Sequence, residues 1–202
     1  MKKHLFTEAI KVKEGKFYDL EMHIERMQQT TLHFFGKSTI FSLSEDIIPV
    51  EKREDLFKCR IVYSDKVVSV EFTPYTFRTI NKLSVVDGED ISYSYKWADR
   101  GDLNKLLDRK GESDDVLIIK DGLATDTSFS NVVFENESGL YTPTSYLLNG
   151  TKRRHLLTQG IIRERVIAKE DILSFSKIHI INSMIDLEDE VWLPISGLRY
   201  CL

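Results

Sequence analysis

The sequence lacks the features that define several classes of protein. Only two of its 202 residues are cysteines, Cys59 and Cys201, and they lie far apart and outside any CxxC pattern. This excludes a disulfide framework and argues against a zinc site. The five histidines show no metal-ligand spacing either, so we expect no metal. Apolar runs approaching the roughly 20 residues of a membrane span are also missing, as are internal repeats and low-complexity stretches.

Charge and composition narrow the class further. A formal net charge of −4, from 28 Lys+Arg and 32 Asp+Glu, argues against a dedicated nucleic-acid-binding protein, which normally carries a basic face. An apolar fraction of 42% with 11 Phe, 8 Tyr and 2 Trp excludes a disordered chain. The first residues predict no signal peptide, because His4, Thr7 and Glu8 interrupt any apolar core. We therefore expect a cytoplasmic protein that binds neither membranes nor nucleic acids.

The first part of the chain predicts an α+β lobe over residues 1–86. A strand is expected over 5–12, followed by a helix over 20–35 that ends at Gly36. The helix is indicated by apolar and small side chains spaced three or four residues apart, which define the face expected to be buried: Leu20, Ile24, Met27, Thr31, Leu32 and Phe35. Further elements follow by pattern: a short helix near 44–57 broken by Pro49, and strands over 58–64, 67–75 and 82–86.

A turn at 87–90 marks the expected boundary to a second lobe over residues 87–202. There, Asp121-Gly122 is the strongest hairpin signal in the sequence. We expect 125–131 to be a polar loop between two apolar strands. The other expected elements are helices over 101–110, 151–159 and 169–175, and strands over 116–120, 132–135, 139–142, 161–168 and 177–181.

Three local features suggest that something small and anionic is bound, and each has a simpler interpretation. Residues 149–153 place a glycine at a helix start, which suits a phosphate but equally suits ordinary capping. The hydroxyl-rich stretch 125–131 could be a solvated turn. Lys96 lies between Tyr95 and Trp97, where an amine can become nucleophilic, although most such lysines extend to solvent.

Taken together, the order of these segments resembles the class IV aminotransferase family. Three stretches carry the resemblance: TDTSFSNVVF at 125–134, LYTP at 140–143 and LLNGTKR at 147–153. The opening strand, the following turn and the His23-x-x-Arg26 helix are similar to the start of the family fold, and the segment up to Ser183 is similar to its end. The resemblance covers nearly the whole chain, with 36–92 the least diagnostic part.

The resemblance implies pyridoxal 5′-phosphate (PLP) as cofactor and assigns its reactive contacts. Lys96 matches the lysine that forms a Schiff base with PLP and then acts as general acid and base. Asp126 matches a position that is normally Glu, whose carboxylate pairs with the pyridine nitrogen. The change keeps the charge and shortens the reach by one methylene. Asp99 falls where lyases of the family often have Asn.

The remaining contacts follow in the same way. Arg26 matches the arginine that binds the cofactor phosphate. Other expected cofactor contacts are the first-turn amides of Thr151 and Lys152, the side chain of Leu148 against the ring, and Ser183 at the phosphate. The Ser183 and Met184 amides match the place of the substrate carboxylate.

The resemblance also implies a fold and leaves three functions open. The fold is an α+β, two-lobe, fold-type IV enzyme like D-amino acid aminotransferase, with the cofactor between the lobes, and a homodimer is expected. The leading function is 4-amino-4-deoxychorismate lyase, which makes 4-aminobenzoate and pyruvate for folate synthesis. The alternatives are a branched-chain or D-amino acid aminotransferase acting on an amino acid-like substrate, and a catalytically silent PLP-binding relative. The cofactor motifs are common to both enzymes.

Overall fold

The structure is a computed structural model that describes residues 4–52 and 54–200, and the chain divides into two compact units. Unit 1 is formed by the residues up to Thr76 together with 95–99, and unit 2 by 77–94 and the residues from Arg100 onward. The mixed α and β content confirms the expected α+β class. The units differ from the lobes predicted at 86/87, since 77–86 belong to unit 2 and the segment with Lys96 belongs to unit 1.

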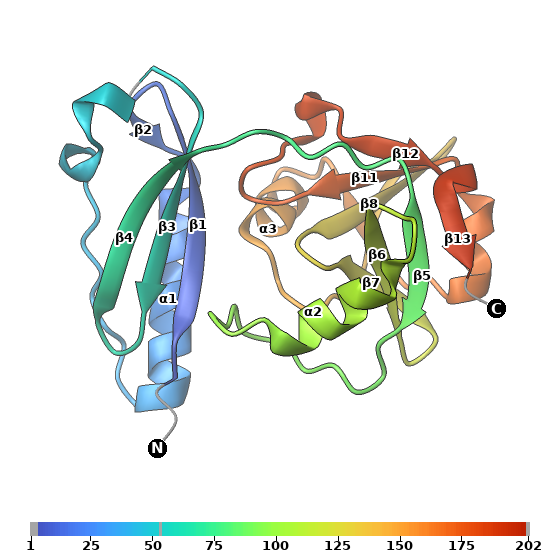
Figure 1. The fold of residues 1–202 in the computed structure, drawn as a ribbon, viewed down its shortest axis with the longest axis horizontal. Helices are drawn as coiled ribbons and strands as arrows, with labels where there is room; N and C mark the ends of the chain where they lie inside the picture. The colour runs from blue at the N-terminus through green and yellow to red at the C-terminus, as the bar shows by residue number, and fades with distance from the viewer. Residues whose placement is uncertain (1–3, 53, 201–202) are drawn as a thin grey trace. The chain divides into compact units, whose positions relative to one another are not determined.

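Unit 1 is a four-stranded antiparallel sheet with one helix against it (Figure 1). Its strands, in the order β2-β1-β3-β4, are β2 (Lys16–Phe17), β1 (Phe6–Lys13), β3 (Phe57–Tyr63) and β4 (Val67–Pro74). Buried and half-buried residues alternate strictly along β3, as expected for a strand with one covered face. The core of the unit lies between this sheet and the helix.

Helix α1 (Leu20–Phe35) has the predicted bounds, and Gly36 ends it with φ 69° in the left-handed region, where glycine carries no steric cost. The predicted buried face is partly wrong. Leu32 is 54% exposed, while His23 and Thr30 are buried. The buried face includes polar side chains because it meets a polar partner on β1, Glu8, which accepts a hydrogen bond from His23.

Residues 95–99 return to unit 1 and extend its sheet by a short bridge. Thr7 N donates to Lys96 O at 2.8 Å, Ala98 N donates to Leu5 O at 2.9 Å, and Phe6 pairs with Trp97. Lys96 is therefore attached to β1 through its own backbone. The helix predicted near 44–57 is wrong in type and extent, since the segment contains two 3-10 turns, 45–47 and 50–52. The predicted break at Pro49 is confirmed, because the two turns lie on either side of it and proline lacks the N–H that a continuous helix requires.

The first sheet of unit 2 is mixed. Its order is β13 (Leu198–Tyr200), β5 (Leu83–Asp87), β6 (Asp115–Lys120) and β7 (Leu123–Thr127). The first three strands are parallel, and β6 and β7 form the predicted antiparallel hairpin. Its turn residues Asp121 and Gly122 both have positive φ, as a tight hairpin turn requires. Helix α2 (Gly101–Leu107) contacts β6 and continues into a 3-10 turn over 108–110.

The second sheet of unit 2 has the order β10 (Arg163–Arg165), β9 (Gly139–Pro143), β8 (Asn131–Asn136), β11 (Lys177–Ile181) and β12 (Trp192–Pro194). Helix α3 (Thr151–Thr158) packs Leu156 against Val133 and Ile181 of this sheet. The predicted strand over 161–168 is shorter, and 169–174 is a 3-10 helix. Neither β12 nor β13 was predicted, and 3-10 turns also occur at 187–189 and 195–197.

The described residues also answer the questions of membrane-spanning helices and of the cysteines. Within the described residues, no helix has both the length and the apolar character needed to cross a membrane. Cys59 is a buried free thiol on β3, as its apolar surroundings predicted, and Cys201 lies outside the described residues.

Gly197 lies where the backbone leaves no room for a side chain. A Cβ at this position would lie 2.6 Å from the backbone oxygen of Asn81 and 3.0 Å from Leu193 Cδ1. Because a backbone carbonyl cannot swing away, we expect Gly197→Ala to lower the free energy of unfolding by about 1–3 kcal/mol. Urea denaturation measures this. Ser196→Ala, an exposed change in the same turn, is the control and should stay within about 0.5 kcal/mol. Equal stability of the two variants would contradict the packing argument.

Candidate functional site

The carboxylate of Asp126 is the centre of the polar site in unit 2. Asp126 lies on β7 and not in a loop, which corrects the prediction for the first half of 125–131. Its side chain is buried. Oδ2 accepts hydrogen bonds from the backbone amides of Leu147 at 3.1 Å and Leu148 at 3.0 Å, and Oδ1 accepts one from Asn131 Nδ2 at 2.8 Å. The carboxylate therefore fixes the segment that leads into α3.

Asn131 joins this carboxylate to the start of α3. Its amide nitrogen donates to Asp126 Oδ1 and also to Leu148 O at 2.9 Å. Its oxygen lies against Gly150, where a Cβ would come within 2.0 Å of Asn131 Oδ1. Position 150 therefore has to be glycine for a reason of space. The sequence singled out this glycine but gave Asn131 no role, although both stand in the quoted motifs.

Burial sets the proton affinity of Asp126. Loss of solvent raises the pKa of the carboxyl from 3.8 to about 6, against the opposing effects of the Leu148 and Asn131 hydrogen bonds. The charge of Arg153 lowers this pKa too, but less. A cation placed beside this buried carboxyl would stabilise its ionised form.

The first turn of α3 carries two buried cations whose charges are already paired. Lys152 forms an ion pair with Asp186. The Asp186 carboxylate therefore offsets part of the positive charge that Lys152 could offer to a bound phosphate. Arg153 donates to Pro143 O at 3.0 Å and pairs with Glu164. Thr151, the first residue of the helix, is buried. The sequence gave no role to Arg153, which joins the first turn of α3 to β9 and β10.

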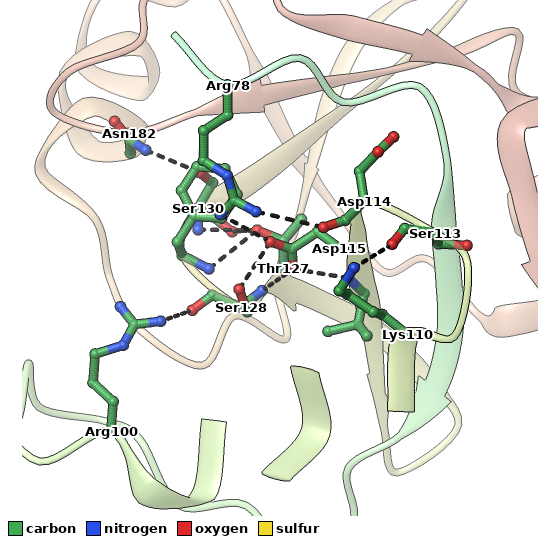
Figure 2. A network of polar contacts seen from close by, with 12 residues as sticks. Arg78, Arg100, Lys110, Ser113, Asp114, Asp115, Thr127, Ser128, Ser130 and Asn182 are labelled. Carbon is green, nitrogen blue, oxygen red and sulfur yellow. Dashed lines mark hydrogen bonds and ion pairs between the residues drawn. The ribbon is translucent and has the colours of Figure 1, made fainter. Parts of the chain in front are cut away.

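A second polar network holds the turn at 128–130 (Figure 2). The buried carboxylate of Asp115 accepts hydrogen bonds from the amide of Ser128 at 3.1 Å and from its hydroxyl at 2.9 Å. Arg100 donates to Ser128 O at 2.7 Å, and Arg78 reaches Asp115 Oδ2 at 3.4 Å. On the other side, Asn182 Nδ2 donates to Ser130 Oγ at 2.9 Å.

This last bond links the turn to the predicted substrate contacts at Ser183 and Met184. The Met184 amide donates to Asn182 Oδ1 at 2.8 Å, so a substrate carboxylate would have to share or replace that bond. Met184 is buried and Ser183 is half-buried. Asn182 thus holds the two segments in register, a role that the sequence did not reveal.

Unit 1 contributes a separate group of charged residues. Glu8 is fully buried and accepts hydrogen bonds from Arg26 Nε at 2.9 Å, Arg26 Nη2 at 2.5 Å and His23 Nδ1 at 2.7 Å. Burial alone would raise the pKa of Glu8, but the Arg26 charge and the His23 and Arg26 hydrogen bonds lower it to about 2. Burial lowers the pKa of His23, and the charges of Arg26 and Lys96 lower it further. Lys96 therefore belongs to this electrostatic group.

Aromatic rings support the segment that carries Lys96. The Trp97 ring packs 4.5 Å from that of Phe6 and 5.1 Å from that of Phe34, and the Tyr95 ring lies 4.7 Å from Phe34. Lys96 itself is half-buried. Over residues 4–52 and 54–200, no three His, Cys, Asp or Glu side chains gather into a group that could hold a metal ion.

The structure thus brings predicted residues together within each unit. In unit 2 Asp126 bonds directly to Leu148, and the loop continues into Thr151 and Lys152. In unit 1 Arg26 and Lys96 belong to one charged group. Sequence reasoning gave Glu8 no role, although the pattern contained a signal. Glu8 occupies the same strand face as the buried Phe6 and Ile10, where an acidic side chain requires a partner.

Comparison with known proteins identifies the family. The family described as Amino-transferase class IV matches residues 92–194. An uncharacterized protein from Haemophilus influenzae is 35% identical over 182 residues, which are 88% of this chain and 96% of that protein. A crystal structure from Haemophilus somnus, provisionally named a 4-amino-4-deoxychorismate lyase, is 32% identical, with a TM-score of 0.81 over 91% of this chain and 98% of that one.

A more distant structure shows the same fold. It is a hypothetical aminotransferase from Mycobacterium tuberculosis in its PLP-bound form, 18% identical with a TM-score of 0.74, covering 96% of this chain and 81% of that one. The chain therefore belongs to the class IV aminotransferase family, as its motifs predicted.

The buried carboxyl of Asp126 makes stability depend on pH in a defined direction. Its folded pKa of about 6 exceeds the ordinary 3.8, so the folded state holds a proton that the unfolded state releases between these values. Without cofactor, we expect the parent to lose stability relative to Asp126→Asn as the pH rises from about 4 to about 6, by up to about 3 kcal/mol. Urea denaturation at several pH values measures the difference. A difference that does not change over this window would contradict the assignment.

Proposed function

We propose that this chain is a PLP-dependent enzyme, and specifically a 4-amino-4-deoxychorismate lyase that releases 4-aminobenzoate and pyruvate. The observation that carries the proposal is the buried Asp126 carboxyl, bonded through Asn131 to the loop that opens α3. The 32% identity to the Haemophilus somnus protein, over nearly all of both chains, favours the lyase.

The residues of unit 2 fit the cofactor. A helix start suits a phosphate because its first amides and its dipole favour an anion, and Thr151 and Lys152 form the first turn of α3. A carboxyl whose pKa is raised by burial suits a basic ring nitrogen, because a cation beside it relieves the cost of ionising it in a buried place. Among residues 4–52 and 54–200, the donors to Asp126 are two amides at Oδ2 and Asn131 at Oδ1, and since a carboxylate accepts about four hydrogen bonds, Oδ1 can accept one more from a ring N–H.

When bound, PLP supplies an electron sink that stabilises negative charge on the α-carbon of an amino-acid substrate. The chain supplies the proton transfers. We propose that the Lys96 amine attaches the cofactor, takes a proton from the substrate α-carbon and later returns it. Asp126 keeps a proton on the ring nitrogen. The proposed cofactor contacts are Arg26, Lys96, Asp126, Leu148, Thr151, Lys152 and Ser183, with Ser183 and Met184 at the substrate carboxylate.

The Lys152 side chain is not proposed to bind the phosphate by its charge. Because its ammonium is paired with Asp186, we propose that position 152 contributes its backbone amide to the phosphate and that its side chain braces the helix start. A silent PLP-binding relative is disfavoured, since an interaction module has no need for the amine, the carboxylate and the arginine together. We also propose, on the resemblance alone, that the chain forms a homodimer.

Covalent attachment to Lys96 is the first test. After incubation with PLP and reduction with borohydride, peptide mapping should locate the cofactor on Lys96. Lys96→Ala should lose the near-visible absorbance while keeping the parent's circular dichroism. Lys11→Ala, which also removes a lysine from the unit 1 sheet, is the matched control and should keep the absorbance. Label on another lysine, or none, would refute the proposed cofactor chemistry.

The reaction itself is the second test. Given 4-amino-4-deoxychorismate and no keto acid, a lyase releases 4-aminobenzoate and pyruvate over many turnovers, because its products together contain all the atoms of the substrate. We expect this result, measured by chromatography of both products. An aminotransferase given only an amino donor stops after at most one product per cofactor. Turnover that needs 2-oxoglutarate or pyruvate, without 4-aminobenzoate, would replace the lyase with an aminotransferase.

A further inference from the structure

Glu8 is a buried charge that the proposed reaction does not use. Its side chain has no exposed surface, and it lies on the face of β1 that is otherwise apolar. Burying a carboxylate is costly unless it is paired and hydrogen-bonded. Glu8 meets that cost with contacts to two side chains of α1, Arg26 and His23, which stand three residues apart and so share one face of the helix.

The contacts show which edge of the Arg26 guanidinium is held. Glu8 Oε1 accepts from Nε at 2.9 Å and Oε2 accepts from Nη2 at 2.5 Å. A guanidinium carries five N–H groups in a rigid plane, so a carboxylate on the Nε–Nη2 edge fixes the direction of the opposite edge, formed by Nη1 and the second N–H of Nη2. The Arg26 side chain is 12% exposed, whereas that of Glu8 is 0% exposed. Arg26 is thus the accessible member of a pair whose carboxylate is fully buried.

His23 completes the support from within the same helix. Because Glu8 is ionised at neutral pH, it can only accept hydrogen bonds, so His23 Nδ1 is the donor of their 2.7 Å bond. The Glu8 oxygen that meets His23 is the one that meets Arg26 Nη2. Three donors from two side chains therefore hold the carboxylate, which cannot rotate without breaking one of them.

The same strand positions the reactive lysine. Thr7, the neighbour of Glu8, donates its amide to Lys96 O at 2.8 Å. The Lys96 ammonium also acts on His23, whose pKa it lowers. Glu8 is thus one residue from the backbone bond that holds Lys96 and in direct contact with Arg26. It couples the two residues of unit 1 to which the proposed function gives a role.

We propose that Glu8 is a positioning residue, which holds the Arg26 guanidinium by one edge so that the other edge recognises the cofactor phosphate, with His23 as its second support. This inference rests on the proposed function, because it takes PLP as the ligand. Bidentate recognition of phosphate requires a fixed guanidinium plane. The charge of Glu8 also offsets that of Arg26, so Arg26 selects phosphate by the direction of its N–H groups more than by net charge.

The test compares two ligands that differ only in the phosphate. Pyridoxine 5′-phosphate and pyridoxine lack the aldehyde, so neither forms a covalent bond to Lys96. Their dissociation constants, from equilibrium dialysis, give a phosphate preference that requires no activity. We expect Arg26→Ala and Glu8→Gln each to reduce the parent's preference by about 10- to 100-fold, the range of a lost supporting contact. The double variant should lie within about threefold of Arg26→Ala, because Glu8 acts only through Arg26.

Glu135→Gln is the matched control. Glu135 in unit 2 also contacts a histidine and a cation, His179 Nε2 at 2.6 Å and Lys177 Nζ at 3.1 Å, although its side chain is 30% exposed, so this variant reports the effect of breaking a similar group away from Arg26. This variant should keep the parent's phosphate preference. Arg26→Lys keeps the charge and removes the planar fork, so it should lose nearly as much preference as Arg26→Ala.

The outcomes separate this inference from the proposed function. A parent that does not prefer the phosphorylated ligand would refute the proposed phosphate site. A parent that does, with Glu8→Gln equal to or better than it, would overturn the role of Glu8 alone. Thermal unfolding checks that each variant is folded. If Glu8→Gln does not fold, Arg26→Lys decides, since a retained preference would mean that charge suffices and that positioning by Glu8 is not needed.

Discussion

A buried carboxylate has to be surrounded by N–H donors, and the polar half of unit 2 is arranged around this requirement at Asp126. Two donors are backbone amides of the segment before α3, and the third is the Asn131 side chain. Those amides can face the carboxylate only if the segment turns toward β7. Asn131 can reach it only if residue 150 has no side chain. One charge therefore dictates the path of the loop, the identity of the glycine and the place where the helix begins.

Two of the buried carboxylates, Glu8 and Asp126, show how surroundings decide proton affinity. Glu8 and Asp126 are both removed from water, which by itself raises the pKa of either group. Glu8 lies against a guanidinium and an imidazole, and its pKa falls to about 2. Asp126 is met mainly by neutral amides, and its pKa rises to about 6. The first is a permanent anion suited to holding a cation, whereas the second can exchange a proton near neutral pH.

Local signals explain which parts of the fold the sequence could predict. Helix α1 and the hairpin at Asp121-Gly122 were predicted correctly because spacing, a terminal glycine and turn residues all agree within a few positions. Strands β12 and β13 were missed because each has three residues, and β13 also pairs with β5, a strand from a distant part of the chain. Likewise, the motifs indicated Asp126 and Gly150, but the role of Asn131 depends on contacts across the fold.

The path of the chain decides which of its segments a genetic crossover would exchange together. It leaves unit 1 after residue 76, returns for residues 95–99 and leaves again, so the short segment that carries Lys96 is bonded to β1 while the stretches before and after that segment belong to unit 2. A fragment that ends at residue 76 would contain the sheet and α1 without the lysine. A single genetic crossover between 76 and 95 would exchange Lys96 together with Asp126 and α3, and would leave Glu8 and Arg26 behind. Lys96 and Asp126 are therefore transmitted as one block, and the support of Lys96 on β1 as another.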